Sequence, residues 1–167
     1  MSNEIKVKPI CGFPGVGKSH VCKLRGWPDS DSSKFSWEPL GVRHPDWPNN
    51  YIEHLKGIDG IVMVSTHKEV RDALHANNIP FMLCYPVHRC KDEYLERYRQ
   101  RGSPETFLTL LDRMWDDWIR ELILEDRAVL RRVLDPGEYA SDVDWPGLVQ
   151  MAFGRYTLSQ SARGGSA

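Results

Sequence analysis

Residues 12–19, Gly-Phe-Pro-Gly-Val-Gly-Lys-Ser, constrain the fold more than any other segment of this chain. They match G-x-x-x-x-G-K-[ST], the pattern of a loop that binds the phosphates of a nucleoside triphosphate. The apolar run that ends at Cys11 predicts a strand before the loop, and the residues from His20 predict a helix after it. Glycines let such a loop turn its backbone N–H groups inward, where the helix N-terminus adds positive potential. This segment therefore predicts a phosphate-binding cradle.

Two side chains of the loop have predicted roles. Lys18 is expected to reach the β- and γ-phosphates, and the Ser19 hydroxyl is expected to ligate Mg²⁺. The alternative is a glycine turn that carries an incidental lysine. The full set of predicted nucleotide-binding residues is Gly12, Phe13, Pro14, Gly15, Val16, Gly17, Lys18, Ser19 and His20.

The length and net charge of the chain indicate a single globular domain that does not depend on a basic surface. A chain of 167 residues is expected to form one domain with a proper core. Its net charge of −1 gives no basic field that would recruit nucleic acid. We expect neither a membrane span nor a cleavable signal region. Cys11 and Cys84 lie in apolar runs and are expected to be buried thiols. None of the four cysteines has metal-ligating spacing, so we expect no structural zinc and a reducing, cytoplasmic setting.

Strand and helix patterns alternate along the chain. Strands are expected at about 5–11, 58–64, 79–85 and 129–134, with another ending near Asp29, and helices at about 20–24, 48–56, 67–76, 91–101 and from Pro104 onward. Thr66 is the expected cap of the 67–76 helix. In the long last helix, Phe107, Leu111, Met114, Trp118 and Leu122 recur at helical spacing and are expected in the core.

This alternation predicts a parallel sheet covered by helices on both faces. Ligands of such sheets bind at the carboxyl ends of the strands. The glycine loop, residues 29–33, residues 65–67 and the segment after Tyr85 are therefore expected around one crevice. We expect one domain over 1–158, with an irregular insertion at about 34–57 and a lid at about 89–104. Residues 159–167 are expected to be a flexible tail.

Asp29 and Asp31 follow the second predicted strand, on the side of the glycine loop. One carboxylate could hold Mg²⁺ through water, while the other orients an acceptor. The alternative is a solvated turn, which Asp-Ser repeats favour. Together with the glycine loop, this spacing favours function, with Asp31 the stronger candidate.

Arg97 and Arg101 lie four residues apart and hence on one helix face. Two guanidinium groups on one face can clamp a phosphoryl group during transfer. The alternative is a solvated face on which nearby glutamates pair with these arginines. Arg99 points elsewhere and serves as a control.

His67 ends the Ser65-Thr66-His67 stretch behind a buried strand. It is a candidate polar contact to a substrate, and the alternative is that it caps the helix that follows.

Three segments resemble the P-loop nucleoside monophosphate kinase-like family, in particular small kinases of the kind found in bacteriophage genomes. They are the glycine loop at 12–19, residues 29–37, and residues 94–103. The last is similar to the Leu-x-x-Arg-x-x-x-Arg-Gly lid segment of guanylate kinases, and Asp29-Ser30-Asp31 is similar to the acceptor-side motif of shikimate kinases.

The resemblance implies a P-loop NTPase three-layer fold with a five-stranded parallel sheet, ATP on the glycine loop and an arginine lid. It also implies an acceptor pocket after the second strand. The residues expected there are Ser32, Ser33, Phe35, Trp37 and His67, with Phe35 and Trp37 as candidates to stack on the acceptor base.

The sequence as a whole predicts an ATP- and Mg²⁺-dependent kinase of a nucleoside or deoxynucleoside monophosphate, working as a monomer or homodimer on nucleotide substrates. Its predicted catalytic residues are Lys18, Asp31, Arg97 and Arg101, and its predicted metal-binding residues are Ser19, Asp29 and Asp31. Two alternatives stay open: a P-loop kinase of another acceptor (a modified base, a polynucleotide end or a small metabolite), and a nucleotide-binding regulatory module.

Overall fold

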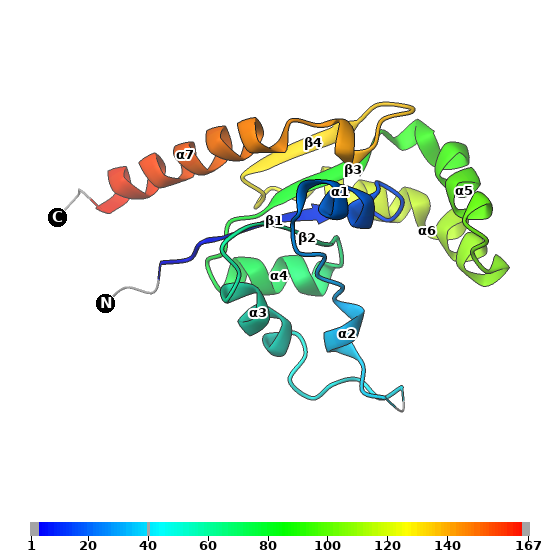
Figure 1. Ribbon diagram of the computed structural model, residues 1–167, viewed down its shortest axis with the longest axis horizontal. Helices are drawn as coiled ribbons and strands as arrows, with labels where there is room; N and C mark the ends of the chain where they lie inside the picture. The colour runs from blue at the N-terminus through cyan, green and yellow to red at the C-terminus, as the bar shows by residue number, and fades with distance from the viewer. Residues whose placement is uncertain (1–3, 40, 165–167) are drawn as a thin grey trace.

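The computed structural model describes residues 4–39 and 41–164 of the chain. Its centre is a parallel sheet of four strands, β1 (Val7–Gly12), β2 (Gly60–Ser65), β3 (Met82–Pro86) and β4 (Leu130–Leu134). The strand order is β2-β1-β3-β4, with helices packed around the sheet (Figure 1). The prediction of an α/β protein with a parallel sheet is thus confirmed.

The prediction of five strands is wrong for the described residues. The segment expected to form the additional strand makes a single parallel bridge, from Asp29 to Met63 of β2. Pro28 has no N–H to donate to a ladder, which hinders pairing just before the bridge. Just after it, Ser33 bonds the Asp31 side chain and turns the chain away from the sheet. The edge of the sheet beside β2 is therefore a loop that ends in polar residues.

Besides the strands, the described residues form seven α-helices and two short 3₁₀ helices. They are α1 (Lys18–Arg25), α2 (Ser33–Ser36), α3 (Asn49–Lys56), α4 (Lys68–Ala76), η1 (His88–Cys90), α5 (Lys91–Gln100), α6 (Glu105–Ile123), η2 (Ala140–Asp142) and α7 (Trp145–Gly164). The insertion at 34–57 thus contains most of α2 and all of α3.

Two boundary predictions need correction. His67, and not Thr66, occupies the N-cap position of α4. α7 runs to Gly164, so residues 159–164 of the predicted tail belong to this helix, while residues 165–167 lie outside the described residues. In Figure 1 the end of α7 extends beyond the sheet.

The buried stripe of α6 differs from the predicted one. Its buried residues are Leu108, Leu111, Trp115, Ile119 and Leu122, while Phe107, Met114 and Trp118 are only partly buried. The predicted stripe included Trp118, but the helix buries Trp115 instead. The Trp115 indole N–H has a partner there, since it donates to the carbonyl of His88 at 2.8 Å. This bond satisfies the polar end of the ring inside the core.

The core continues directly beneath the glycine loop. Phe13 is buried, and its ring centroid lies 5.3 Å from that of Trp115 in an edge-to-face contact. Its backbone N–H donates to the carbonyl of Cys84 in β3 at 2.9 Å. The loop is therefore anchored to α6 and β3, which fixes it at the carboxyl end of β1.

All four cysteines are free and buried, as expected for Cys11 and Cys84. Burial raises the pKa of the Cys11 thiol to about 12, so this group stays protonated and acts as a small apolar side chain. No helix among the described residues combines the length and the apolar character that a membrane span requires.

Candidate functional site

The glycine loop folds tightly around the Lys18 side chain. A Cβ atom on Gly12 would lie 2.9 Å from Cγ of Lys18, so a larger residue would displace the lysine. Gly15 has a φ of 91°, and a Cβ there would lie 2.9 Å from the Tyr94 ring. Both the left-handed backbone and the close ring therefore demand glycine at this position.

The Lys18 ammonium group lies inside the loop, where it donates to the carbonyl oxygen of Gly12 at 2.9 Å. Loss of water contact lowers its pKa, an effect that the nearby Cys84 and Asp29 oppose. The amine is thus held in place by one backbone contact and is poorly hydrated. A phosphate oxygen would supply the negative charge that this position lacks.

A cavity of about 620 Å³ opens over the loop, a volume typical of small-molecule sites. Its walls come from the glycine loop, the start of α1, α5 and the segment around η2. The lining residues are Gly15, Gly17, Lys18, Ser19, His20, Arg97, Tyr98, Gln100, Arg101, Tyr139 and Ser141.

The cavity brings most of the predicted nucleotide-binding residues together with both lid arginines. Phe13 and Val16 differ, because their side chains are buried in the core and only their backbone groups could meet a ligand. Pro14 lines a separate, smaller cavity. Sequence reasoning did not name Tyr98 and Gln100 as cavity residues, although both lie in the predicted lid at 89–104, and it missed Ser141, which belongs to no motif.

Arg97 is firmly held in the wall of this cavity. It donates to the carbonyl oxygens of Gly15 at 2.8 Å and Glu138 at 2.9 Å. Its guanidinium carbon lies 4.3 Å from the ring centroid of Tyr94 and 3.7 Å from that of Tyr139. These contacts join the glycine loop, α5 and the segment after β4, so much of the hydrogen-bonding capacity of Arg97 is already used.

Arg101 is placed differently on the same helix face. It is exposed at the cavity, and its guanidinium carbon lies 5.1 Å from the ring centroid of Tyr98. Its positive charge contributes to the lowered pKa of Lys18 after the larger effect of burial. Arg99 points to solvent and pairs with Glu96 at 3.5 Å, which matches its role as a control.

A second cavity of about 330 Å³ lies between the insertion and the start of α4. It contains four of the five predicted acceptor-side residues, and the complete lining is Ser32, Ser33, Ser36, Trp37, Arg43, Trp47, His67, Lys68 and Glu69. Phe35 is absent from it. Its ring packs instead on Tyr51 at 5.2 Å and His54 at 4.7 Å between centroids, so α2 directs Phe35 toward α3.

Trp37 and Trp47 form an aromatic wall of this second cavity. An ion pair between Arg43 and Glu69 lies against this wall and was not predicted from the sequence. Glu69 accepts two hydrogen bonds from Arg43, at 3.0 and 3.1 Å, and one from the indole of Trp47. The Arg43 guanidinium carbon lies 5.0 Å from the Trp37 ring centroid. Trp37 remains 52% exposed and presents ring surface to solvent. The tryptophans of this wall come from the insertion at 34–57, whereas Glu69 comes from α4, so no local sequence pattern links them.

The two aspartates do not line the cavity over the glycine loop, where a nucleotide was predicted to bind. Asp31 accepts hydrogen bonds from the Ser33 backbone N–H at 2.9 Å and the Ser33 hydroxyl at 2.7 Å, as in a solvated turn. Partial burial opposes ionisation of Asp31, but these bonds prevail and lower its pKa. Asp29 is close enough to raise the pKa of Lys18 against the larger effect of burial.

The described residues contain no group of three or more His, Cys, Asp or Glu side chains that could hold a metal ion. Mg²⁺ commonly keeps several waters and takes few protein ligands together with substrate phosphates. Ser19, exposed in the cavity beside Lys18, fits such a role. Asp29 and Asp31 lie outside this cavity, so they could contact a Mg²⁺ ion beside Ser19 only through a bridging water.

His67 lies between two cavities. It lines the second cavity, on the predicted acceptor side, and also the smaller one, of about 200 Å³, that includes Pro14 of the glycine loop. Burial, with help from the charge of Lys18, lowers the pKa of His67 below its usual range. The imidazole is therefore neutral at pH 7 and can accept or donate a hydrogen bond.

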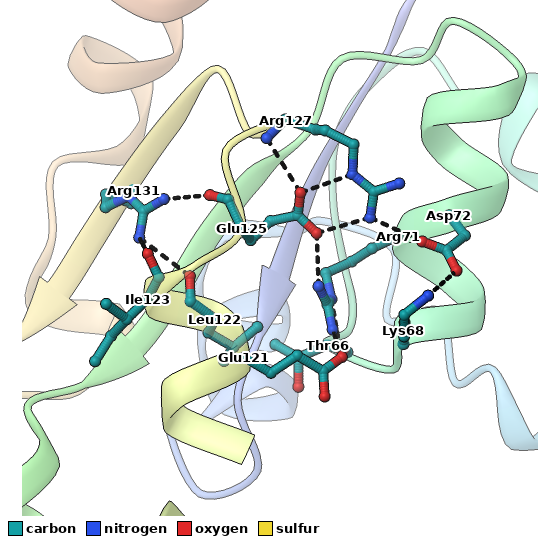
Figure 2. Close-up of polar contacts among 10 residues, drawn as sticks. All are labelled: Thr66, Lys68, Arg71, Asp72, Glu121, Leu122, Ile123, Glu125, Arg127 and Arg131. Carbon is teal, nitrogen blue, oxygen red and sulfur yellow. Dashed lines mark hydrogen bonds and ion pairs between the residues drawn. The ribbon is translucent and has the colours of Figure 1, made fainter. Parts of the chain in front are cut away.

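A network of charged residues joins α4 to the end of α6 and the segment after it (Figure 2). Arg71 of α4 contacts Glu125 at 2.6 Å, and both side chains are only 3% exposed. Glu125 also accepts hydrogen bonds from Arg127, which in turn contacts Asp72 at 2.8 Å. Sequence reasoning missed this network because its members come from α4 and from the segment after α6.

Acid is expected to destabilise the protein through Glu125. Hydrogen bonds from the Arg127 side chain, followed by its backbone N–H and Arg71, lower the pKa of Glu125 to about 2. Because this value lies below that of the unfolded chain, the carboxylate stabilises the fold above about pH 4.5 and ceases to do so as the pH falls toward 2. Each unit of pKa difference corresponds to about 1.4 kcal/mol.

Urea denaturation between pH 7 and pH 2.5 measures this effect. Glu125→Gln should be less stable than the wild type at pH 7, and the difference should shrink as the pH falls below about 4.5. A difference that stays constant with pH would contradict the assignment to Glu125.

No protein-family model matches this chain, and no curated protein sequence matches it. Among solved structures, an uncharacterized protein from Eubacterium ventriosum is similar to it, with a TM-score of 0.46 and 12% identity. The similarity covers 91% of this chain and 98% of that chain. A likeness of this size carries no argument about activity, so the case for function depends on the residues of the two cavities.

Proposed function

We propose that this protein transfers a phosphoryl group from ATP, with Mg²⁺, to a nucleoside or deoxynucleoside monophosphate. One observation carries the proposal: the lysine and serine of a complete glycine loop share a cavity with Arg97 and Arg101. A phosphate-binding loop alone would suit many nucleotide-binding proteins. Arginines that face the same cavity suit a reaction in which charge on a transferring phosphoryl group must be stabilised.

On the donor side, Lys18 and the backbone N–H groups of the glycine loop would hold the β- and γ-phosphates of ATP. Ser19 would hold the metal, and the chemistry that bound Mg²⁺ supplies is neutralisation of charge on the phosphate oxygens. Arg101 would meet the phosphoryl group as it transfers, because its exposed guanidinium faces the cavity. Arg97 would hold the wall of the site through Gly15 and Glu138.

On the acceptor side, the cavity beside α2 supplies an aromatic surface and hydroxyl groups. The exposed ring of Trp37 suits stacking on a base, while Ser32 and Ser33 offer hydroxyl groups. A phosphate oxygen of the acceptor would form a bond to the γ-phosphorus while the bond to the β–γ bridging oxygen breaks. ADP and a nucleoside diphosphate are the products, and atoms and charge balance without a further reactant.

The test is a coupled assay of ADP release from ATP with a panel of acceptors: nucleoside monophosphates, nucleosides, a 5′-hydroxyl oligonucleotide and small polyols. Rates that depend strongly on one or more monophosphates support the proposal. A preference for another acceptor would keep the kinase and replace its substrate. Slow hydrolysis that no acceptor changes would point to a regulatory nucleotide-binding module and overturn the proposal.

Asp31→Asn is expected to impair the acceptor or metal step and to leave ATP binding nearly unchanged. Asp31 lies outside the nucleotide cavity, and its hydrogen bonds from Ser33 shape the turn that leads into α2. We expect the KM for the acceptor to rise about tenfold, as when a hydrogen bond to a charged group is lost. Titration with ATP and steady-state kinetics measure the two effects separately. Unchanged kinetic constants would leave Asp31 as a turn residue only.

A further inference from the structure

We propose that Arg71 is a positioning residue for the acceptor side of the site, because it fixes the turn that carries His67. This turn comprises Thr66, His67 and Lys68, between β2 and α4. The inference rests on the proposed function for its kinetic consequence, although the placement of the turn can be tested without any activity.

The contact that carries the inference is the hydrogen bond from Nε of Arg71 to the carbonyl oxygen of Thr66, at 2.9 Å. This carbonyl immediately precedes His67, the N-cap residue of α4. Neither Thr66 nor His67 makes a side-chain capping bond at the start of this helix. The Arg71 side chain therefore supplies the hydrogen bond that ties the Thr66 carbonyl of this turn in place.

The other nitrogen atoms of Arg71 tie it to α6 and the segment after it. Nη1 contacts Glu125 at 2.6 Å, and Nη2 contacts Glu121. Figure 2 shows the guanidinium group between these carboxylates and Thr66, with Arg127 on the far side of Glu125. Glu125 is fixed in turn by two hydrogen bonds of 2.8 Å from Arg127. Arg71 thus joins the turn directly to two carboxylates, one on α6 and one on the segment after it.

The turn occupies the point where placement matters most. His67 and Lys68 line both the acceptor-side cavity and the smaller cavity that includes Pro14. A shift of this turn would change the shape of both cavities together. It would leave the nucleotide cavity intact, because neither His67 nor Lys68 lines that one.

Arginine is required here because three different nitrogen atoms contact three partners in fixed directions. A lysine offers one ammonium group on a flexible stem. In Arg71→Lys that group can still pair with Glu125 or Glu121, but the Nε–H that holds Thr66 is gone. Arg71→Lys therefore keeps the positive charge of the buried network but removes the hydrogen bond that positions the turn.

The experiment compares Arg71→Lys with Arg127→Lys. The second variant makes the same chemical change in the same network, and Arg127 contacts neither Thr66 nor any of the three cavities. Three readouts are taken on each: the His67 ring signals in NMR spectra, assigned with His67→Gln; ATP affinity by titration; and KM and kcat for the best acceptor of the panel.

We expect Arg71→Lys to move the His67 ring signals and to raise the acceptor KM about tenfold, the factor that about 1.4 kcal/mol gives. Its ATP affinity should stay within about twofold, since the nucleotide cavity is untouched. Arg127→Lys should leave His67 signals, ATP affinity and acceptor KM close to the wild type.

Equal changes in both variants would assign Arg71 a purely structural role, and unmoved His67 signals in Arg71→Lys would overturn the positioning role. If the wild type transfers no phosphoryl group, the proposed function fails, while the His67 signals still decide whether Arg71 holds the turn. The two failures are thus distinguishable.

Discussion

Replacing Lys18 with alanine is expected to lower phosphoryl transfer by about 10²-fold or more and to leave the fold largely intact. The side chain lies within the glycine loop and donates a hydrogen bond to the Gly12 carbonyl at 2.9 Å. Without the ammonium group, the β- and γ-phosphates lose the cation that offsets their charge inside the loop. Most of that cost is expected in turnover, because charge stabilisation is greatest during transfer.

The measurement is steady-state ADP release with the preferred acceptor, together with circular dichroism and thermal unfolding. Lys23→Ala is the matched control, since Lys23 is an exposed lysine of the same helix, away from the cavity. It should behave like the wild type. Full activity in Lys18→Ala would refute the role of the glycine loop in catalysis, and unfolding of this variant would show that Lys18 serves the fold instead.

The glycine loop could be predicted from sequence because a single local segment determines its geometry. Glycines at 15 and 17 take positive φ angles of 91° and 89°, and Lys18 follows at the start of α1. The strand before the loop and the helix after it are likewise set by local apolar patterns. The parallel sheet followed from the alternation of such elements.

The predictions that failed concern contacts between distant segments. Phe35 and Trp37 were equivalent in sequence, and only the packing of α2 on α3 sends Phe35 to Tyr51 and His54. Arg71 and Glu125 are 54 positions apart, so no local pattern links them. The missing strand failed for a local reason instead, because the turn just after Asp29 limits its pairing with β2 to one bridge, which apolar periodicity does not reveal.

Arg97 and Arg101 line one cavity, as their spacing predicted, but they have different partners there. Helical spacing placed Arg97 and Arg101 on one face, and both do line the nucleotide cavity. Their partners differ, however: Arg97 holds backbone carbonyls of Gly15 and Glu138, while Arg101 contacts only the edge of the site through Tyr98. Tyr94 anchors this helix beneath the loop, with its ring centroid 5.4 Å from that of Trp115. A rigid α5 with one free arginine fits the structure better than a helix that swings as a whole.

Arg101→Ala is accordingly expected to lower turnover by about tenfold or more with a smaller effect on ATP affinity. Its guanidinium group is exposed and free to tighten on the phosphoryl group as charge develops. Arg97→Ala is expected to act mainly on ATP affinity, because it releases the Gly15 carbonyl and so loosens the loop. Arg101→Lys should recover only part of the lost turnover, since an ammonium group cannot supply two parallel hydrogen bonds.

Titration with ATP and steady-state kinetics on the three alanine variants at 97, 99 and 101 separate these roles. Arg99→Ala is the control, because Arg99 pairs with Glu96 in solvent and lies outside the cavity. If Arg101→Ala resembles Arg99→Ala in turnover, then Arg101 belongs to a solvated face and takes no part in transfer. If Arg97→Ala lowers turnover and leaves ATP affinity unchanged, Arg97 must leave its backbone partners during the reaction, and α5 would then have to move after all.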